Sequence, residues 1–216
     1  HGGGFYNFKK ELVEKLLNIG VEVHFAVPFD EKVEYLEVLG AVFHRIDIDR
    51  RGINPIKDLG LLDQLRKVIK ATKPEVLVLH TIKPNIYASI LARAYRIPYL
   101  NNITGLGSAL QQNSKMAKLL RSLYRNSLAG SSGIFFENSG NRDYFLKYHI
   151  GRQEKYILVP GAGVNIEHFK NETRESRSAD FTTFLFIGRI MKEKGIDEFF
   201  EAAIRVKEKH SNVKFQ

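Results

Sequence analysis

Short runs of β-branched and aromatic residues alternate with longer segments of helical periodicity, and this alternation restricts the fold more than any other feature. Strand, helix, strand, repeated in this way, is typical of an α/β fold, a parallel sheet with helices on both faces. The expected strands are Val21–Val27, Ala41–Ile46, Glu75–His80, Pro98–Asn102, Gly133–Glu137 and Tyr156–Val159. The expected helices are Tyr6–Asn18, Glu31–Leu39, Pro55–Ala71, Pro84–Tyr95, Ser114–Leu128 and Gly140–Tyr148.

Proline and glycine mark the ends of the expected helices. Pro55 and Pro84 stand in first helical turns, where a missing backbone N–H is tolerated. Gly20 and Gly40 each follow a helical segment and precede a strand-like run, as helix C-caps do. These four residues support the element boundaries that the periodicity predicts.

The composition divides the chain at Asn171–Asp180, a polar segment without apolar periodicity that we interpret as a linker. Residues 1–170 are expected to form one domain without its first strand, because a Gly2–Gly4 turn leads directly into a helix. Residues 181–216 are expected to begin a second domain whose remainder is absent. Its elements are a strand at Phe181–Gly188, a helix at Gly195–Lys209 and the start of a strand at Asn212–Gln216. Unpaired sheet edges of such a fragment favour self-association.

Positive charge is concentrated in one part of the chain. The sequence has 33 Lys and Arg against 24 Asp and Glu, a net charge of +9, and the stretch from Val76 to Phe136 contains no acidic residue. A basic field of this kind favours a partner with phosphates, such as a nucleotide, a nucleic acid or an anionic lipid surface. A solubilising surface explains it equally well. The basic residues of the stretch are Lys83, Arg93, Arg96, Lys115, Lys118, Arg121 and Arg125.

Several function classes are excluded or disfavoured by composition. The absence of Cys excludes disulfides, thiolate zinc sites and a Cys nucleophile, and no run approaches the ~20 apolar residues of a membrane span. No HExxH, DxD or other metal-binding spacing occurs, so we expect no metal and no cofactor. We expect no nucleic acid either, because the aromatic residues are not interleaved with the basic ones.

Polar residues follow the expected strands, at the edge where open parallel sheets bind ligands. His80 ends a hydrophobic strand beside Thr81 and Lys83, where an imidazole can relay a proton or contact a phosphate. Glu137 ends another strand, where a carboxylate can position a sugar hydroxyl or act as a base. Each has a structural alternative: His80 as a hydrogen-bonded structural residue, and Glu137 as a cap of the following helix.

Two further groups are candidates for binding phosphate. Gly2–Gly4 before a helix offers backbone N–H groups and the positive end of the helix dipole, although a simple tight turn explains the glycines too. Arg189 and Lys194 flank the entry to another helix and suit a diphosphate. Their structural alternative is a pair of solvated basic residues in a charged loop.

The segment Ser114–Leu128 reads as an amphipathic basic helix. Such a helix can lie in the interface of an anionic membrane. It can equally pack its apolar stripe on the sheet while the basic side chains reach solvent. The stripe consists of Met116, Leu119, Leu120, Leu123, Tyr124 and Leu128.

Six segments appear in this order along the chain: GGGFYNFKKEL, HTIKPNIYASILAR, IPYLNNITGLGSAL, FFENSGNRDYF, VPGAGVNIEHF and FIGRIMKEKGIDEFFEAA. In this order they resemble family 4 glycosyltransferases of the GT-B fold, in particular bacterial enzymes that extend lipid-linked sugars for capsule, O-antigen or N-glycan precursors. The resemblance implies retaining transfer of a sugar from a UDP-sugar to a polyprenyl-diphosphate-linked or polysaccharide acceptor. It also implies a cytoplasmic protein peripheral to the inner face of the membrane, with Ser114–Leu128 against anionic lipid.

The resemblance assigns roles to residues by their position in these motifs. The resemblance implies that an N-terminal Rossmann-like domain holds the acceptor and a second Rossmann-like domain holds the nucleotide. It implies no metal, because two cations neutralise the donor diphosphate. Catalytic candidates are His80 and Glu137. Donor-diphosphate candidates are Arg189, Lys194, Gly3 and Gly4, and acceptor candidates are Tyr6, Asn7, Thr81, Lys83, Asn85, Thr104 and Gly105.

Two other functions remain open. One is another protein of the GT-B fold such as a UDP-sugar 2-epimerase, which would carry a different set of His and Asp groups in its cleft. The other is a basic, non-catalytic binding module. Since the family's paired-glutamate motif is missing from the sequence, the 216-residue chain is expected to be inactive by itself.

Overall fold

A computed structural model of the chain describes residues 2–29, 33–49, 54–111, 114–170, 181–188 and 190–216. The chain divides into two compact units, His1–Asn165 and Ile166–Gln216. The predicted linker, Asn171–Asp180, lies outside the described residues.

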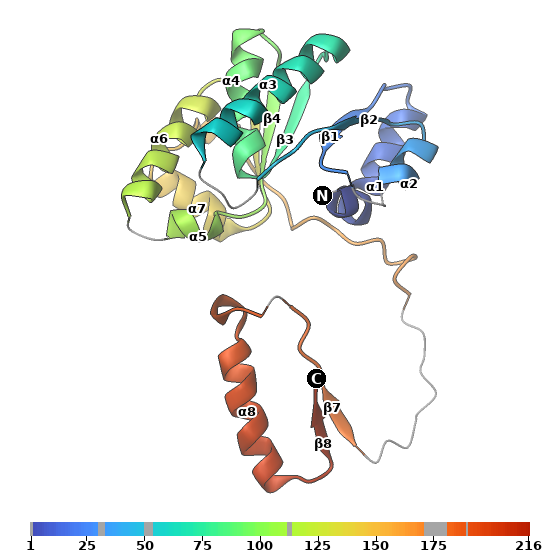
Figure 1. The fold of residues 1–216 in the computed structure, drawn as a ribbon, viewed down its shortest axis with the longest axis vertical. Coiled ribbons are helices and arrows are strands. Elements are labelled where there is room, and N and C mark those ends of the chain that lie inside the picture. The colour runs from blue at the N-terminus through green and yellow to red at the C-terminus, as the bar shows by residue number, and fades with distance from the viewer. Residues whose placement is uncertain (1, 30–32, 50–53, 112–113, 171–180, 189) are drawn as a thin grey trace. The chain divides into compact units, whose positions relative to one another are not determined.

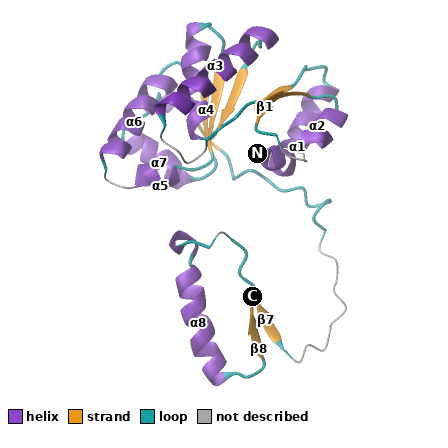
Figure 2. Ribbon diagram, viewed as in Figure 1, coloured by secondary structure: helices purple, strands orange, loops and turns teal. Residues whose placement is uncertain are grey.

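The first unit alternates helices and strands in the predicted order (Figures 1 and 2). Its strands are β1 (His24–Val27), β2 (Val42–Arg45), β3 (Leu77–His80), β4 (Tyr99–Ile103), β5 (Gly133–Phe136) and β6 (Tyr156–Leu158). Its helices are α1 (Gly2–Asn18), α2 (Val33–Val38), α3 (Pro55–Thr72), α4 (Ile82–Ala94), α5 (Gly107–Gln111), α6 (Lys115–Leu128) and α7 (Ser139–Lys147), with a 3-10 turn, η1, at Gln153–Lys155.

All strand pairs of this unit are parallel, as the alternation predicts. β1 pairs with β2 in one sheet, and β3, β4, β5 and β6 pair in sequence order in a second. Each crossover between neighbouring strands of the larger sheet contains a helix. The carboxyl ends of β3, β4 and β5 therefore lie at one edge of the sheet.

Helices flank both faces of the parallel sheets. Phe25 and Val27 of β1 are buried in a cluster with residues of α1 and α2, whereas Ala26 and Ile46 contact a cluster built on α3 and α4. Alternate residues of a strand point to opposite faces, so β1 is enclosed from both sides. Figure 1 shows α1 and α2 beside the β1–β2 sheet.

The larger sheet buries its apolar residues under α3, α4, α6 and α7. There the Phe145 ring packs edge to face against two other rings. Its centroid lies 5.5 Å from that of Tyr124 and 5.2 Å from that of Phe136. The buried Tyr99 hydroxyl donates to the Ser127 carbonyl at 2.7 Å. On the opposite face Val78 of β3 is 55% exposed. On this face the middle of β3 is thus exposed, whereas Asn102 near the carboxyl end of β4 is buried.

The first helix begins earlier than predicted. Gly2–Gly4 form the first turn of α1 and not a separate turn, so that prediction is wrong. The rest of the helix is anchored by apolar residues such as Val13, and this packing outweighs the low helix propensity of glycine. The backbone N–H groups of a first turn still have no intrahelical partner. The short α5 is also absent from the sequence prediction, because five residues carry no readable periodicity.

The second unit is one β-α-β crossover. It contains β7 (Thr182–Phe184), the 3-10 turn η2 (Lys192–Lys194), α8 (Ile196–Lys209) and β8 (Val213–Phe215), and the two strands are parallel. The rings of Phe184 and Phe215 stack with centroids 4.9 Å apart, and Phe199 of α8 packs on Phe215. This is the strand-helix-strand order predicted for 181–216. Among the helices of both units that the structure describes, none is long and apolar enough to cross a membrane.

Four helices of the first unit end in the same hydrogen-bonded motif. Gly20 and Gly40 have φ values of 82° and 101°, and the residue after each donates back to the helix, so their prediction as C-caps is confirmed. Arg96 and His149 adopt the same left-handed conformation with φ values of 57° and 49°. A side chain costs free energy in this conformation, whereas glycine does not.

We predict that Arg96→Gly stabilises the protein by about 0.5–1 kcal/mol, since relief of the left-handed strain exceeds the added entropy of the unfolded chain. Thermal unfolding should show a rise of about 2 °C. The matched control Gly40→Ala introduces the same strain and should lower the unfolding temperature. A lower unfolding temperature for Arg96→Gly would contradict this account of the helix ends.

Candidate functional site

Three polar side chains at the ends of neighbouring strands form one hydrogen-bonded group, here named the strand-end cluster: His80, Asn102 and Glu137. His80 is the last residue of β3 and pairs in register with Asn102 of β4, while Glu137 follows β5 directly. The Asn102 Nδ2 group donates to His80 Nδ1 at 3.2 Å and to Glu137 Oε1 at 3.1 Å. The structure therefore brings the two predicted catalytic residues together through an asparagine that sequence reasoning did not select.

The cluster contains a neutral imidazole. Burial, together with the positive charge of Lys9, lowers the pKa of His80 to about 4. An amide nitrogen only donates, so His80 Nδ1 is the acceptor and the ring proton lies on Nε2. At neutral pH His80 is accordingly a hydrogen-bond donor without charge, which fits contact with a hydroxyl better than attraction of a phosphate.

The positive charge of Lys9 in α1 contributes to the lowered pKa of His80. Farther along, Asn165 Nδ2 donates to Glu11 Oε1 at 2.8 Å, so the segment after β6 reaches the same helix. The predicted acceptor residue Asn7 is exposed on α1, which also contains Tyr6, Gly3 and Gly4. Nothing beyond their helical backbone is described for these last three residues.

The link from β3 to α4 is strained. Thr81 has φ 68° and ψ 167°, a region that is nearly restricted to glycine, and its side chain does not cap the helix. A β-branched residue in this region costs on the order of 1–3 kcal/mol. The strain makes the turn sharp, so that α4 begins directly at the carboxyl edge, and Pro84 lies in its first turn as predicted.

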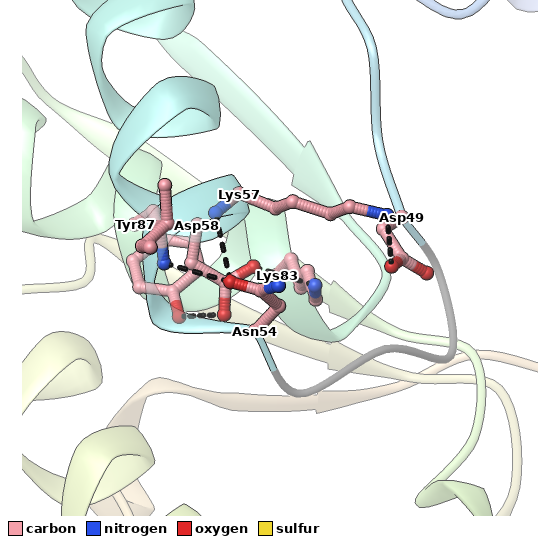
Figure 3. A network of polar contacts seen from close by, with 7 residues as sticks. Asp49, Asn54, Lys57, Asp58, Lys83 and Tyr87 are labelled. Atoms are coloured by element: carbon pink, nitrogen blue, oxygen red, sulfur yellow. Dashed lines mark hydrogen bonds and ion pairs between the residues drawn. The ribbon is translucent and has the colours of Figure 1, made fainter.

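Lys83 does not lie free at this edge. Its Nζ forms an ion pair with Asp58 Oδ1 of α3 at 2.5 Å, and the side chains are only 13% and 15% exposed (Figure 3). Tyr87 donates its hydroxyl to Asp58 Oδ2 at 2.8 Å. Burial and this hydrogen bond raise the pKa of Tyr87 to about 12. A phosphate on Lys83 would have to compete with Asp58, a residue that sequence reasoning missed.

The first turn of α3 holds Asp58 in position. The Asn54 side chain caps the helix by accepting from the N–H groups of Ile56 and Lys57 at 3.0 and 3.3 Å. Pro55 occupies the first helical position, as predicted. Lys57 also pairs with Asp49 at 3.5 Å, as Figure 3 shows. Asn54 followed by Pro55 is a sequence signal for the start of this helix. It gives no indication that Asp58 pairs with Lys83.

Asn85 supports the edge from within. It is 1% exposed, its Nδ2 donates to the Asn102 carbonyl at 3.0 Å, and its Oδ1 accepts from Asn101 Nδ2 at 3.0 Å. Asn101 donates also to Ser89 at 3.0 Å. Because both ends of the Asn85 amide are used, this predicted acceptor residue ties α4 to β4 and does not present its side chain to a ligand.

The remaining predicted residues are distributed over both units. Thr104 and Gly105 are exposed in the segment between β4 and α5, beyond the carboxyl end of β4. Lys194 is exposed in η2 of the second unit, and Arg189 lies outside the described residues. Asn138, not Glu137, caps α7 by accepting from the Asn141 N–H at 2.8 Å, so the capping alternative for Glu137 is wrong.

Two basic residues of α6 are used inside the fold. Arg121 is 8% exposed and its guanidinium lies 4.1 Å from the ring centroid of Tyr148. Arg125 donates to the carbonyls of Tyr148 and His149 at 2.8 and 3.3 Å. Both therefore attach α6 to the end of α7. Over the residues that the structure describes, no group of three or more His, Cys, Asp or Glu side chains could hold a metal ion.

The depressed pKa of His80 predicts acid sensitivity. The unfolded chain takes up this proton near pH 6.5, but the folded chain does so only near pH 4, so stability is complete above pH 6.5 and falls between these values. The loss attributable to His80 is about 3 kcal/mol. In urea unfolding at several pH values, His80→Gln should flatten this decline, while His210→Gln, at an exposed position, should not. Equal declines in wild type and His80→Gln would refute the assignment.

Comparison with known proteins supports a glycosyltransferase relationship. The profile of the glycosyl transferase 4-like family matches residues 2–138. A Campylobacter jejuni relative, named N,N′-diacetylbacillosaminyl-diphospho-undecaprenol α-1,3-N-acetylgalactosaminyltransferase, is 26% identical over 223 residues. That match covers 96% of this chain and 59% of the relative, so the chain spans less than two thirds of the relative's length.

Solved structures share the fold at low identity. Anabaena HepE in complex with UDP and glucose gives a TM-score of 0.69 at 14% identity, over 94% of this chain and 55% of that chain. The UDP-GlcNAc 2-epimerase of Neisseria meningitidis bound to UDP-GlcNAc gives 0.58 at 15% identity, over 94% and 60%. At these identities the similarity establishes the fold alone, a Rossmann-like α/β fold that is shared with proteins of the GT-B class.

The family profile covers more than half of the chain. Its range contains the polar edge that the structure assembles, from His80 of β3 through Asn102 of β4 to Glu137 after β5. The chain belongs to the glycosyl transferase 4-like family.

Proposed function

We propose that the protein takes part in retaining transfer of a hexosyl unit from a UDP-sugar to a polyprenyl-diphosphate-linked acceptor in surface polysaccharide synthesis. The observation that carries this proposal is the strand-end cluster in a member of the glycosyl transferase 4-like family. The Campylobacter relative, whose name states transfer to a diphospho-undecaprenol-linked sugar, supports the acceptor class. HepE, solved with UDP, supports the donor class.

The structure favours hydroxyl recognition at the edge of the first unit. Neutral His80 offers an N–H donor and Glu137 offers carboxylate oxygens, the pair of functions that a sugar hydroxyl uses. Exposed Thr104 and Gly105 extend this surface beyond β4. In the proposal the acceptor sugar contacts His80 and Glu137, and a diphosphate reaches Lys83 only by exchange with Asp58.

The donor diphosphate is assigned in this proposal to Arg189 and Lys194. A guanidinium fork and an ammonium can stabilise the charge of a departing diphosphate without a metal. Lys194 is exposed next to the start of α8, which is consistent with the role. This half of the proposal rests on the sequence motif and on the exposure of Lys194.

The transfer reaction is testable directly. The 216-residue chain, and separately any longer natural chain that contains it, is incubated with a panel of UDP-sugars and an undecaprenyl-diphosphate-linked sugar, and UDP release and acceptor mass are measured. We expect one donor to add a single hexosyl unit with retained anomeric configuration in the longer chain. Glu137→Gln should lower turnover about 100-fold, whereas Lys70→Glu, on an exposed face of α3, should not. Absence of transfer with every donor would remove the proposal.

An epimerase is the second candidate, because a UDP-GlcNAc 2-epimerase shares the fold over 94% of this chain. The same incubation separates the two functions. An epimerase converts one UDP-sugar into another without needing a lipid-linked acceptor and without transferring the sugar to it. A UDP-sugar product formed without acceptor would favour the epimerase over the transferase.

We also propose that α6 contacts anionic membrane through its exposed side chains. The exposed residues that carry this proposal are Lys115, Lys118 and Leu119, the last of which is 52% exposed. Arg121 and Arg125 are attached to α7 and belong to the fold, so they are not part of the proposed contact. Two lysines near an anionic surface contribute about 1 kcal/mol each, a modest and salt-dependent attraction.

The double variant Lys115→Glu/Lys118→Glu should bind vesicles containing phosphatidylglycerol at least 10-fold more weakly than wild type at low salt, because two attractions are replaced by repulsions. Co-sedimentation measures the bound fraction. The control Lys67→Glu/Lys70→Glu makes the same charge change on exposed residues of α3 and should bind like wild type. Equal losses in both double variants would show a general effect of net charge and contradict a specific role of α6.

A further inference from the structure

Asn102 occupies the centre of the strand-end cluster. It is 7% exposed, and its two amide hydrogens have different acceptors, His80 Nδ1 at 3.2 Å and Glu137 Oε1 at 3.1 Å. A carboxylate can only accept, so the orientation of the amide is fixed with its nitrogen toward Glu137. The same nitrogen then leaves His80 Nδ1 no role other than acceptor.

The oxygen end of the Asn102 amide costs folding free energy. No described residue donates to Asn102 Oδ1, although the atom is buried. A buried acceptor without a partner costs about 1–3 kcal/mol, so an apolar residue at this place would be less costly for folding alone. The two N–H donors of Asn102 are thus kept at the expense of an unsatisfied oxygen. This imbalance is expected where a function requires the donors.

We propose that Asn102 is a positioning residue, which holds His80 as the neutral Nε2–H tautomer and couples the ring to Glu137. An imidazole held in this way presents a donor at Nε2, while its acceptor, Nδ1, is already used by Asn102. His80 and Glu137 then act as one donor-acceptor pair for the hydroxyls of a sugar substrate. The sugar assignment rests on the proposed function, whereas the tautomer and the coupling to Glu137 do not.

The charged groups around His80 agree with this role. Lys9 of α1 disfavours an imidazolium, and Glu137, one hydrogen bond beyond Asn102, would favour it. Asn102 separates the ring from the carboxylate by contributing a neutral amide between them. Replacement of this amide by a carboxylate places an acceptor against His80 Nδ1 and removes the separation.

The first test is nitrogen-15 NMR of the 216-residue chain with labelled histidine, with His80→Gln used to assign the signal. We expect wild-type His80 to be the Nε2–H tautomer from pH 8 to pH 5. In Asn102→Asp, we expect a proton at Nδ1 and a titration midpoint at least one pH unit higher. Asn138→Asp, the same change at a neighbouring exposed cap, should leave His80 as in wild type. An Nδ1–H tautomer in wild type would overturn the proposal without any variant.

Asn102→Ala provides a second variant if Asn102→Asp does not fold. It removes both donors, so a mixture of the two His80 tautomers is expected, and an unmixed Nε2–H tautomer would overturn the proposal. In a transfer assay, Asn102→Ala should lower kcat at least 10-fold with KM changed less than 2-fold. If wild type shows the Nε2–H tautomer but transfers no sugar, the proposed function is wrong and the role of Asn102 stands. If the His80 tautomer is the same in the variants as in wild type, the role of Asn102 is refuted.

Discussion

The parallel register of β3, β4 and β5 is the constraint on which the site depends. It sets His80 opposite Asn102, and it brings Glu137 to the same edge from the next strand. Because residues paired in parallel strands share a face, these three side chains meet on the face away from α3 and α4. Burial near Lys9 then keeps His80 neutral. Backbone pairing thus determines the position of the cluster, and burial near Lys9 determines the protonation of His80.

Several basic residues of the acid-free stretch make contacts within the fold. Of the basic residues between Val76 and Phe136, Lys83 is paired with Asp58, Arg121 lies on Tyr148 and Arg125 donates to backbone carbonyls. These charges stabilise helix contacts and are not available to a phosphate without rearrangement. Lys115 and Lys118 remain exposed on α6. Part of the positive charge in the acid-free stretch therefore stabilises the fold. Fewer basic side chains can bind a ligand than the net charge suggests.

Periodicity and cap residues were sufficient to predict the order of strands and helices, because each element carries its own local signal. Gly20 and Gly40 predicted two helix ends, while Arg96 and His149 gave no signal because they adopt the left-handed conformation without glycine. The site was predicted in part, since strand ends can be found from hydrophobic runs. Asp58 and Asn102 could not be found in this way. Their roles depend on side-chain contacts with residues 25 and 35 positions away, which no local pattern encodes.

The central claim is that the edge formed by β3, β4 and β5 binds a lipid-linked sugar. Chemical-shift mapping of the chain with a short-chain polyprenyl-diphosphate-linked sugar tests it most directly. The account predicts that the largest backbone shifts occur at Thr81, Thr104 and Asn138, next to the strand-end cluster. Shifts confined to the amino ends of the strands, or no saturable shifts at all, would contradict it.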